Sequence, residues 1–197
     1  MRWSVAFCNK YHKKSKKTDQ IIESALLKLM DSSDLNKITM NELADMANIN
    51  RVTIYRHFND KWAIIEQIEA RLFTALKKPH QKMLDQLALK SDNGIEYLTN
   101  FLQVFKDNLV TIRTLISSHG DLSFSTKLMD HLLEMEGLSH SLMHLQANND
   151  LQELFSYYSI SALIGIIRFW TIHPNYSAKE MATFFFKMRN GELTKLS

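Results

Sequence analysis

Residues 38–61 read ITMNELADMANINRVTIYRHFNDK and contain the most specific local pattern of the chain. It opens on a capping-box pattern, in which the Thr39 hydroxyl accepts from the amide of Glu42 and the Glu42 carboxylate reaches back to the start of the helix. Apolar residues at helical spacing follow this box. The pattern predicts a short helix that ends near Ala47.

A three-residue turn joins this helix to a second one over about residues 51–58. Asn48 can adopt the left-handed conformation that a tight turn needs, and Asn50 is a good N-cap for the next helix. Because Ile54 and Phe58 share one helix face, they are expected to pack inward. The outward face then carries small, polar and basic side chains: Val52, Thr53 and Arg56. Two short helices joined in this way have the geometry that enters a DNA major groove.

Residues 38–61 resemble the helix-turn-helix signature of the TetR/AcrR transcriptional regulators, through the elements T-x-x-E-L-A and T-I-Y-R-H-F and the following Lys. The resemblance extends over about residues 18–65 and departs from the family at Asn48 and Val52, where Gly is usual or frequent. Val52 adds bulk to the surface that faces the groove. The resemblance implies an all-α fold of about nine helices, with an N-terminal DNA-binding head and a C-terminal body for effector binding and dimerisation.

The resemblance also implies which residues contact a double-stranded DNA operator. Phosphates would be held at Thr39 and Lys61, since helix N-termini and cations bind phosphate. Nine residues are expected to contact DNA: Thr39, Asn50, Arg51, Val52, Thr53, Tyr55, Arg56, His57 and Lys61. Other interpretations stay open: Tyr55 and His57 can be packing residues, and the two arginines can be exposed solubilising charges.

The charge of the 197-residue chain is concentrated at its N-terminal end. The formal net charge is +3, but residues 1–61 carry 11 basic and 7 acidic side chains, a net charge of +4. Six of the basic side chains lie within the first 17 residues, which contain no acidic residue. This basic arm favours a polyanionic partner, although a solvated terminus would have the same composition.

Scarce Gly and Pro and the recurrent helical spacing predict helices throughout the chain. A helix is expected over about residues 18–30, and a fourth one from about 60 to 78, ending at Pro79. Further helices are expected near residues 80–89, 94–117, 124–146, 150–172 and 177–189. The expected domains are a basic arm (1–17), a helix-turn-helix domain (18–62) and a helical body (63–197). The body resembles the TetR-like subgroup that includes the activator of dihydroxyacetone kinase genes, through Phe124, Leu128, Gly165, Trp170, Pro174, Ser177, Glu180 and Met181.

The last two helices are expected to form a homodimer interface. Small residues at Ser161, Ala162 and Gly165 allow another helix to approach closely, and apolar side chains surround them: Leu154, Ile166, Phe169, Met181, Phe184, Phe185 and Met188. A core within one chain would need many of the same residues. Dimerisation is still expected, because one recognition helix contacts too few bases for specific binding, and two related heads would read a palindrome.

An effector pocket is expected among the middle helices of the body, for an unknown small molecule or protein. Its candidate lining combines aromatic residues and methionines: Tyr97, Phe101, Phe105, Met129, Met143, Phe155 and Tyr158. A pocket lined mainly by apolar side chains, with a few polar groups among them, is typical of a small-molecule site. The alternative for each of these residues is ordinary core packing.

The sequence carries no motif of a known catalytic class, such as a Gly-rich phosphate loop, G-x-S-x-G or H-E-x-x-H. We therefore expect no enzyme, cofactor or metal; His140 and His144 are spaced like a metal pair but lack further ligands. The lone Cys8 cannot form an internal disulfide. The longest strongly apolar stretch, residues 160–172, is shorter than a membrane span, which favours a cytoplasmic protein. The alternative function is a helical module that binds a partner protein.

Overall fold

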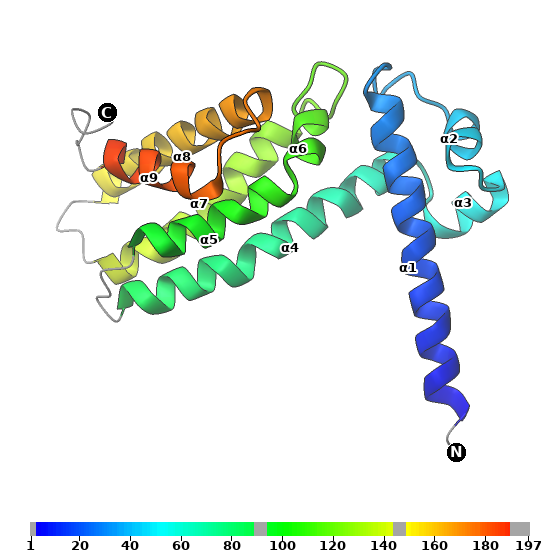
Figure 1. Ribbon diagram of the computed structural model, residues 1–197, viewed down its shortest axis with the longest axis horizontal. Coiled ribbons are helices and arrows are strands. Elements are labelled where there is room, and N and C mark those ends of the chain that lie inside the picture. Colours follow the sequence, from blue (N-terminus) through cyan, green and yellow to red (C-terminus); the bar gives the residue numbers. More distant parts are fainter. Residues whose placement is uncertain (1–2, 89–93, 144–148, 190–197) are drawn as a thin grey trace. The chain divides into compact units, whose positions relative to one another are not determined.

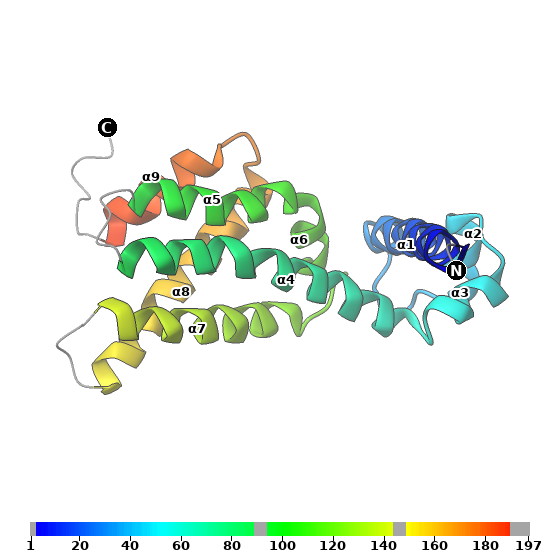
Figure 2. The ribbon, with the colours of Figure 1, turned by 90° about the horizontal axis from the view of Figure 1, so that it is seen from below.

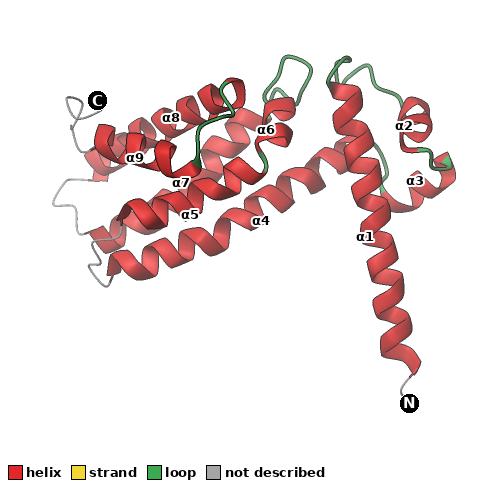
Figure 3. Cartoon of the chain, viewed as in Figure 1, coloured by secondary structure: helices red, strands yellow, loops and turns green. Residues whose placement is uncertain are grey.

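The computed structural model describes the backbone of residues 3–88, 94–143 and 149–189, and the side chains of residues 15–82, 94–135 and 150–188. Within these ranges the regular elements are all helices (Figures 1 and 3). The expected all-α fold is therefore confirmed. The helices are α1 (Trp3–Met30), α2 (Met40–Ala47), α3 (Arg51–His57), α4 (Lys61–Ala88), α5 (Gly94–Asp107), α6 (Leu109–Leu115), α7 (Phe124–Met143), α8 (Asn149–Ile172) and α9 (Ala178–Arg189).

The chain divides into two compact units. The first unit, called the head here, comprises Met1–Ala70 together with the loop Ser117–Asp121. The second unit, the body, comprises Arg71–Ile116 and Leu122–Ser197. The helix α4 begins in the head and ends in the body, and the loop between α6 and α7 belongs to the head although both helices belong to the body.

The head packs α1, α2, α3 and the start of α4 around a small apolar core. Its most deeply buried side chains come from each of these four helices: Ile22, Leu26, Leu43, Ile54, Ile64 and Ile65. The helix α1 starts at Trp3, which corrects the expectation of a helix that starts near residue 18. The first Pro and Gly of the chain are Pro79 and Gly94, so no helix breaker interrupts the basic segment.

The helix α4 continues through Pro79 to Ala88, so the expectation that it ends at Pro79 is wrong. Proline inside a helix removes one backbone hydrogen bond and costs about 3 kcal/mol. The buried side chains of Leu76 and His80 lie on both sides of Pro79. Burial of this stripe continues across the proline and offsets its cost, so the expected separate helix over residues 80–89 is the end of α4.

The body packs α4 between α5 and α7, as Figure 2 shows. Its largest fully buried side chains are Phe105, Phe124 and Trp170. The expected helix over residues 94–117 is divided into α5 and α6 at Asn108, whose amide nitrogen Nδ2 donates to the Val104 carbonyl. Asparagine bonds the backbone locally in this way and so favours helix ends.

Within the described residues, one segment, Asp150–Ile172 of α8, has the length and the apolar composition of a membrane-spanning helix. Buried helices of soluble proteins have the same two properties, and 39% of the most apolar stretch of this segment is buried inside the protein. This segment is longer than the strongly apolar stretch 160–172, because it also includes the first turns of α8, which contain both polar and apolar residues.

Candidate nucleic-acid interface

The start of α2 is fixed by a complete capping box. The Thr39 hydroxyl Oγ1 accepts from the Glu42 amide at 3.2 Å, and the Glu42 carboxylate accepts from the Thr39 amide at 2.8 Å. The Thr39 hydroxyl also donates to the same carboxylate at 2.8 Å. These bonds from Thr39 lower the pKa of Glu42, because they stabilise the charged carboxylate. The local pattern read from the sequence is therefore confirmed.

The turn between α2 and α3 is set by two asparagines. Asn48 adopts the left-handed conformation, with φ 51° and ψ 45°, and its N–H donates to the carbonyl oxygens of Ala44 and Asp45. The side-chain oxygen of Asn50 accepts from the Val52 amide at 2.8 Å and caps α3. Since both asparagines act within their own turn, they fix the direction in which α3 leaves α2.

The helix α3 has one buried and one exposed face. Ile54 is fully buried, whereas 61% of the Val52 surface and 42% of the Tyr55 surface is exposed. The Arg51 guanidinium donates to the Tyr55 hydroxyl at 3.1 Å and lies 5.2 Å from the centre of its ring. Arg51 and Arg56 are exposed, and α3 contains no acidic residue. The helix therefore presents an uncovered, cationic and partly aromatic face, with Thr53 half-buried at its edge.

Two residues that the family resemblance assigns to DNA also hold the head together. The His57 Nδ1 lies 2.6 Å from the Asp19 carboxylate, which ties α3 to α1. The Lys61 ammonium donates to the carbonyl oxygens of Asn36 and Ile38, each at 2.7 Å, and burial lowers its pKa. An ammonium has three donors, so Lys61 retains one N–H for a phosphate.

Sequence reasoning missed Trp62, whose indole is exposed at the first turn of α4. The Lys61 ammonium lies 5.8 Å from the centre of its ring. The helical spacing of the sequence could have predicted this exposure. The buried stripe of α4 contains Ile64, Ile65 and Ile68, and the position directly after Lys61 lies outside it.

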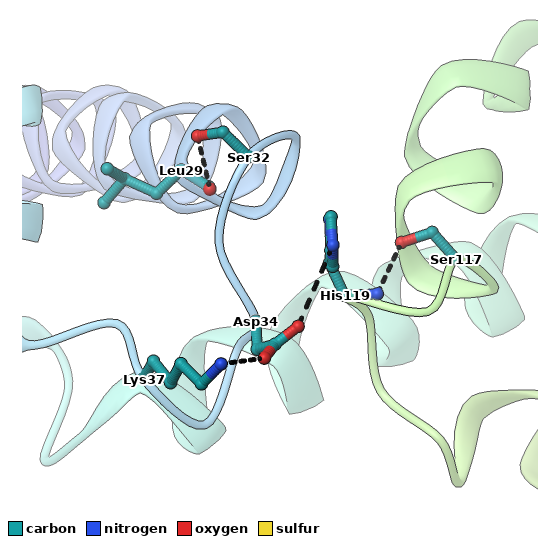
Figure 4. A network of polar contacts seen from close by, with 6 residues as sticks. All are labelled: Leu29, Ser32, Asp34, Lys37, Ser117 and His119. Carbon is teal, nitrogen blue, oxygen red and sulfur yellow. Dashed lines mark hydrogen bonds and ion pairs between the residues drawn. The ribbon is translucent and has the colours of Figure 1, made fainter.

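The loop Ser117–Asp121 is anchored to the loop that precedes α2 (Figure 4). The Leu35 amide donates to the His119 carbonyl at 2.9 Å, and the His119 Nε2 lies 3.8 Å from the Asp34 carboxylate. Lys37 pairs with the same carboxylate at 2.7 Å and is the main cause of the lowered pKa of Asp34. No local pattern in the sequence predicts the contacts of His119 with Leu35 and Asp34, because they join residues more than 80 positions apart.

The candidate dimer residues meet on one face of α8 and α9. A groove of about 880 Å³ is lined by six of them: Ala162, Gly165, Ile166, Phe169, Met181 and Phe184. A smaller hollow of about 130 Å³ adjoins it at Phe185 and Met188. A Cβ added at Gly165 would meet no atom within 4 Å, so its small size serves no contact within the chain. Ser161 and Leu154 are also exposed.

The candidate effector residues are distributed over three helices of the body. Tyr97, Phe101 and Phe105 follow one another on α5, and the rings of the last two lie 5.6 Å apart. Met129 on α7 and Phe155 on α8 are half-buried, while Tyr158 is exposed and lines the 130 Å³ hollow of the α8–α9 face. The side chain of Met143 lies outside the described residues.

The described side chains include no group of three or more His, Cys, Asp or Glu residues that could hold a metal ion. The candidate pair His140 and His144 lies outside the residues whose side chains the structure describes, as does Cys8.

A capped helix, a tight left-handed turn and a second helix with an exposed cationic face define a helix-turn-helix DNA-binding protein. Comparison with known proteins gives the family. Residues 21–68 match the bacterial regulatory proteins of the tetR family, and residues 92–191 match a transcriptional regulator C-terminal region. The chain belongs to the TetR family of transcriptional regulators, which are soluble DNA-binding proteins and generally not enzymes.

Individual relatives agree with this assignment. A stretch of 47 residues is 38% identical to the uncharacterized HTH-type transcriptional regulator YxbF of Bacillus subtilis (strain 168), a match over 24% of this chain and only 12% of that relative. Among solved structures, a TetR transcriptional regulator from Streptococcus agalactiae 2603V is similar, with a TM-score of 0.64, 21% identity, and coverage of 92% of this chain and 98% of that one.

Two further structures share the fold at lower identity. The dihydroxyacetone kinase operon activator DhaS has a TM-score of 0.61 and 16% identity, over 90% of this chain and 96% of that one. NalD, the secondary repressor of the MexAB-OprM multidrug efflux pump in Pseudomonas aeruginosa, has a TM-score of 0.58 and 15% identity, over 91% and 97% of the two chains. These likenesses show the arrangement of helices in the family.

Proposed function

We propose that this protein is a homodimeric regulator that binds a palindromic operator through the exposed face of α3. The observation that carries the proposal is the division of α3 into a fully buried side at Ile54 and an uncovered side at Val52 and Tyr55. In this arrangement Arg51, Val52, Thr53 and Arg56 lie nearest the base edges, which only side chains inside a groove can reach.

The remaining candidate residues would position the head on the DNA backbone. The spare N–H of Lys61 and the start of α2 at Thr39 are suited to phosphate contacts, since these groups read no sequence. Asn50 and His57 act through α3, because Asn50 caps it and His57 ties it to Asp19 of α1. The carboxylate of Asp19 thereby fixes the ring of His57 at the C-terminal end of α3.

The α8–α9 face supports dimerisation. Its groove of about 880 Å³ lies between exposed apolar side chains such as Phe169 and Phe184. Apolar surface of this kind is characteristic of a subunit interface. Gly165 has open space beside it, which allows the helix of a second copy to approach closely. A twofold dimer would place two heads on two half-sites.

An effector would act in the body and alter the head through the chain connections between them. One repressor of the same fold, FadR of Thermus thermophilus, is known in complex with lauroyl-CoA, with a TM-score of 0.51 and 15% identity. We extend small-molecule binding to this chain. Of the candidate effector residues, the half-buried Tyr97, Met129 and Phe155 are the ones that a ligand would contact, whereas Phe101 and Phe105 belong to the buried core of the body. The sign of regulation would follow from which of the two states of the protein the ligand binds more tightly.

The loop Ser117–Asp121 supplies a second connection besides α4. It is bonded to the head at Leu35 and Asp34, yet it joins α6 to α7 of the body. A shift of either helix would therefore pull on the loop that precedes α2. Through this connection, a ligand that binds in the body and does not touch DNA would alter the conformation of the head.

Selection of bound fragments from the source genome tests the proposed function. Purified protein is mixed with sheared genomic DNA, and the retained fragments are sequenced. We expect an enriched inverted repeat with half-sites about one helical turn apart, and an affinity that falls steeply as salt rises. Fragments without a shared motif, bound with the same affinity as random DNA, would contradict a sequence-specific regulator.

A further inference from the structure

A groove of about 340 Å³ lies on the surface of the head between α1 and α2. Its lining includes Lys17, Ile21 and Lys28 of α1 and Met46 of α2, and small side chains at Ala25 and Ala47 leave room for the hollow. It contains no residue of α3. The groove is therefore separate from the face that the proposed function assigns to DNA.

The middle of this α1–α2 groove is exposed and partly apolar, since Gln20 and Ser24 line it together with Ile21 and Met46. Ile21 has 41% and Met46 has 48% of its surface in solvent, although both face the same hollow. Adjoining apolar side chains around a surface hollow indicate a site for an apolar group of a partner. Methionine adapts its shape to the group that it contacts.

The two ends of the groove are cationic. Lys17 and Lys28 are eleven positions apart on α1, which places them on one face of the helix about 16 Å from each other along its axis. Both are exposed, and neither forms an ion pair with another described residue. The lining of the groove contains no acidic side chain that would neutralise them.

We propose that the α1–α2 groove binds an acidic amphipathic helix of another protein. Carboxylates three helical turns apart on that helix would pair with Lys17 and Lys28, and apolar side chains between them would contact Ile21 and Met46. A second copy of the head is a poor occupant, because residues 1–61 carry a net charge of +4. DNA would engage the two lysines, Gln20 and Ser24 but would leave Ile21 and Met46 without apolar contacts, so the lining favours a protein helix.

This inference goes beyond the proposed function and does not depend on it, because the groove can be tested without DNA. Binding there would leave Val52 and Tyr55 of α3 exposed. A protein seated on its operator would thus retain a surface for a second macromolecule.

A designed peptide tests the groove directly. The probe is a synthetic stapled helix with two glutamates eleven residues apart and two leucines between them on the same face; a matched peptide carries glutamine in place of glutamate. Methyl-detected NMR of the full-length protein should show shifts at Ile21, Ala25, Met46 and Ala47. The dissociation constant of the glutamate peptide should be about tenfold lower than that of the glutamine peptide, since two exposed ion pairs supply that much.

Charge exchange supplies the controls. The double variant K17E/K28E should lose about tenfold in affinity for the glutamate peptide and gain a similar factor for a peptide with lysines at the same positions. The variant K16E changes a neighbouring exposed lysine outside the groove lining and should bind the glutamate peptide as the wild type does. Equal effects of K16E and K17E/K28E would overturn the proposal. So would duplex DNA that shifts the same methyl groups and displaces the peptide, because the groove would then belong to a DNA surface.

Discussion

Replacement of Asn48 tests whether the turn between α2 and α3 fixes the recognition helix. Among the described residues, Asn48 is the one residue other than glycine with a positive φ, at 51°. Alanine has no side chain that hydrogen-bonds the local backbone in this conformation, so N48A should cost the head about 1 kcal/mol. N48G should stay within about 0.5 kcal/mol of the wild type, because relief of the left-handed strain is offset by the greater freedom of the unfolded chain.

Hydrogen exchange of the full-length protein measures this cost locally. A loss of about 1 kcal/mol corresponds to roughly fivefold faster exchange in segments that open with the head. We expect this acceleration for N48A in α2 and α3, with exchange of α8 and α9 unchanged. Wild-type protection in N48A, or equal acceleration in N48A and N48G, would refute the role assigned to the left-handed turn.

Three further variants test other parts of the structure. T39A should destabilise the head by about 1 kcal/mol in denaturant unfolding, since it removes the hydroxyl that caps α2. Because the pKa of Glu42 is lowered in the folded state, the bond from this hydroxyl to the Glu42 carboxylate contributes at neutral pH and is lost as the pH falls below the ordinary value of 4.5. The difference in stability between T39A and the wild type should therefore narrow in acid without vanishing, because the bond from the Glu42 amide to the hydroxyl does not titrate; an equal difference at neutral and acid pH would contradict this role of the carboxylate. P79A should stabilise the body by up to about 3 kcal/mol, seen as a higher melting temperature, and an unchanged or lower one would contradict a continuous α4. G165L should shift the mass measured by light scattering from dimer to monomer while the helical circular dichroism is retained, because a side chain there meets open space within one chain; a dimeric G165L would exclude this face as the interface.

The helix-turn-helix could be predicted from sequence because its signals are local. The capping bonds of Thr39 join residues three positions apart, and the bond from Asn50 spans two positions. Asn48 needs only its own backbone conformation. Such interactions form whenever the local helix forms, so residue types at short spacing are sufficient to predict them.

The contacts between the helices of the head could not be predicted from residue types at short spacing. His57 meets Asp19 at a separation of 38 positions, and Lys61 bonds carbonyl oxygens 23 and 25 positions away. Each of these contacts depends on how helices pack, and many residues of the same type elsewhere in the sequence could form equivalent pairs. The family resemblance assigned both side chains to DNA, whereas the structure adds a structural role for each.

Helix boundaries in the body show where local rules and packing compete. Pro79 is a strong stop signal, but the buried residues on both sides keep α4 continuous. Asn108 is a weaker signal within an apolar pattern, and it nevertheless divides α5 from α6. Whether a helix continues or ends at such a residue depends on how much apolar area the neighbouring segments bury. This buried area cannot be calculated from the sequence alone.

The base preference of α3 variants measures whether the exposed face of α3 enters the major groove. Wild type, T53A and R56A are presented with a randomised duplex library, and K61A serves as a backbone-contact control. We expect changed base preferences in T53A or R56A, with a loss on the order of 1–3 kcal/mol for the preferred base, and a uniform loss of affinity without a change of preference in K61A. Unchanged base preference in both T53A and R56A would contradict the insertion of α3 into the major groove.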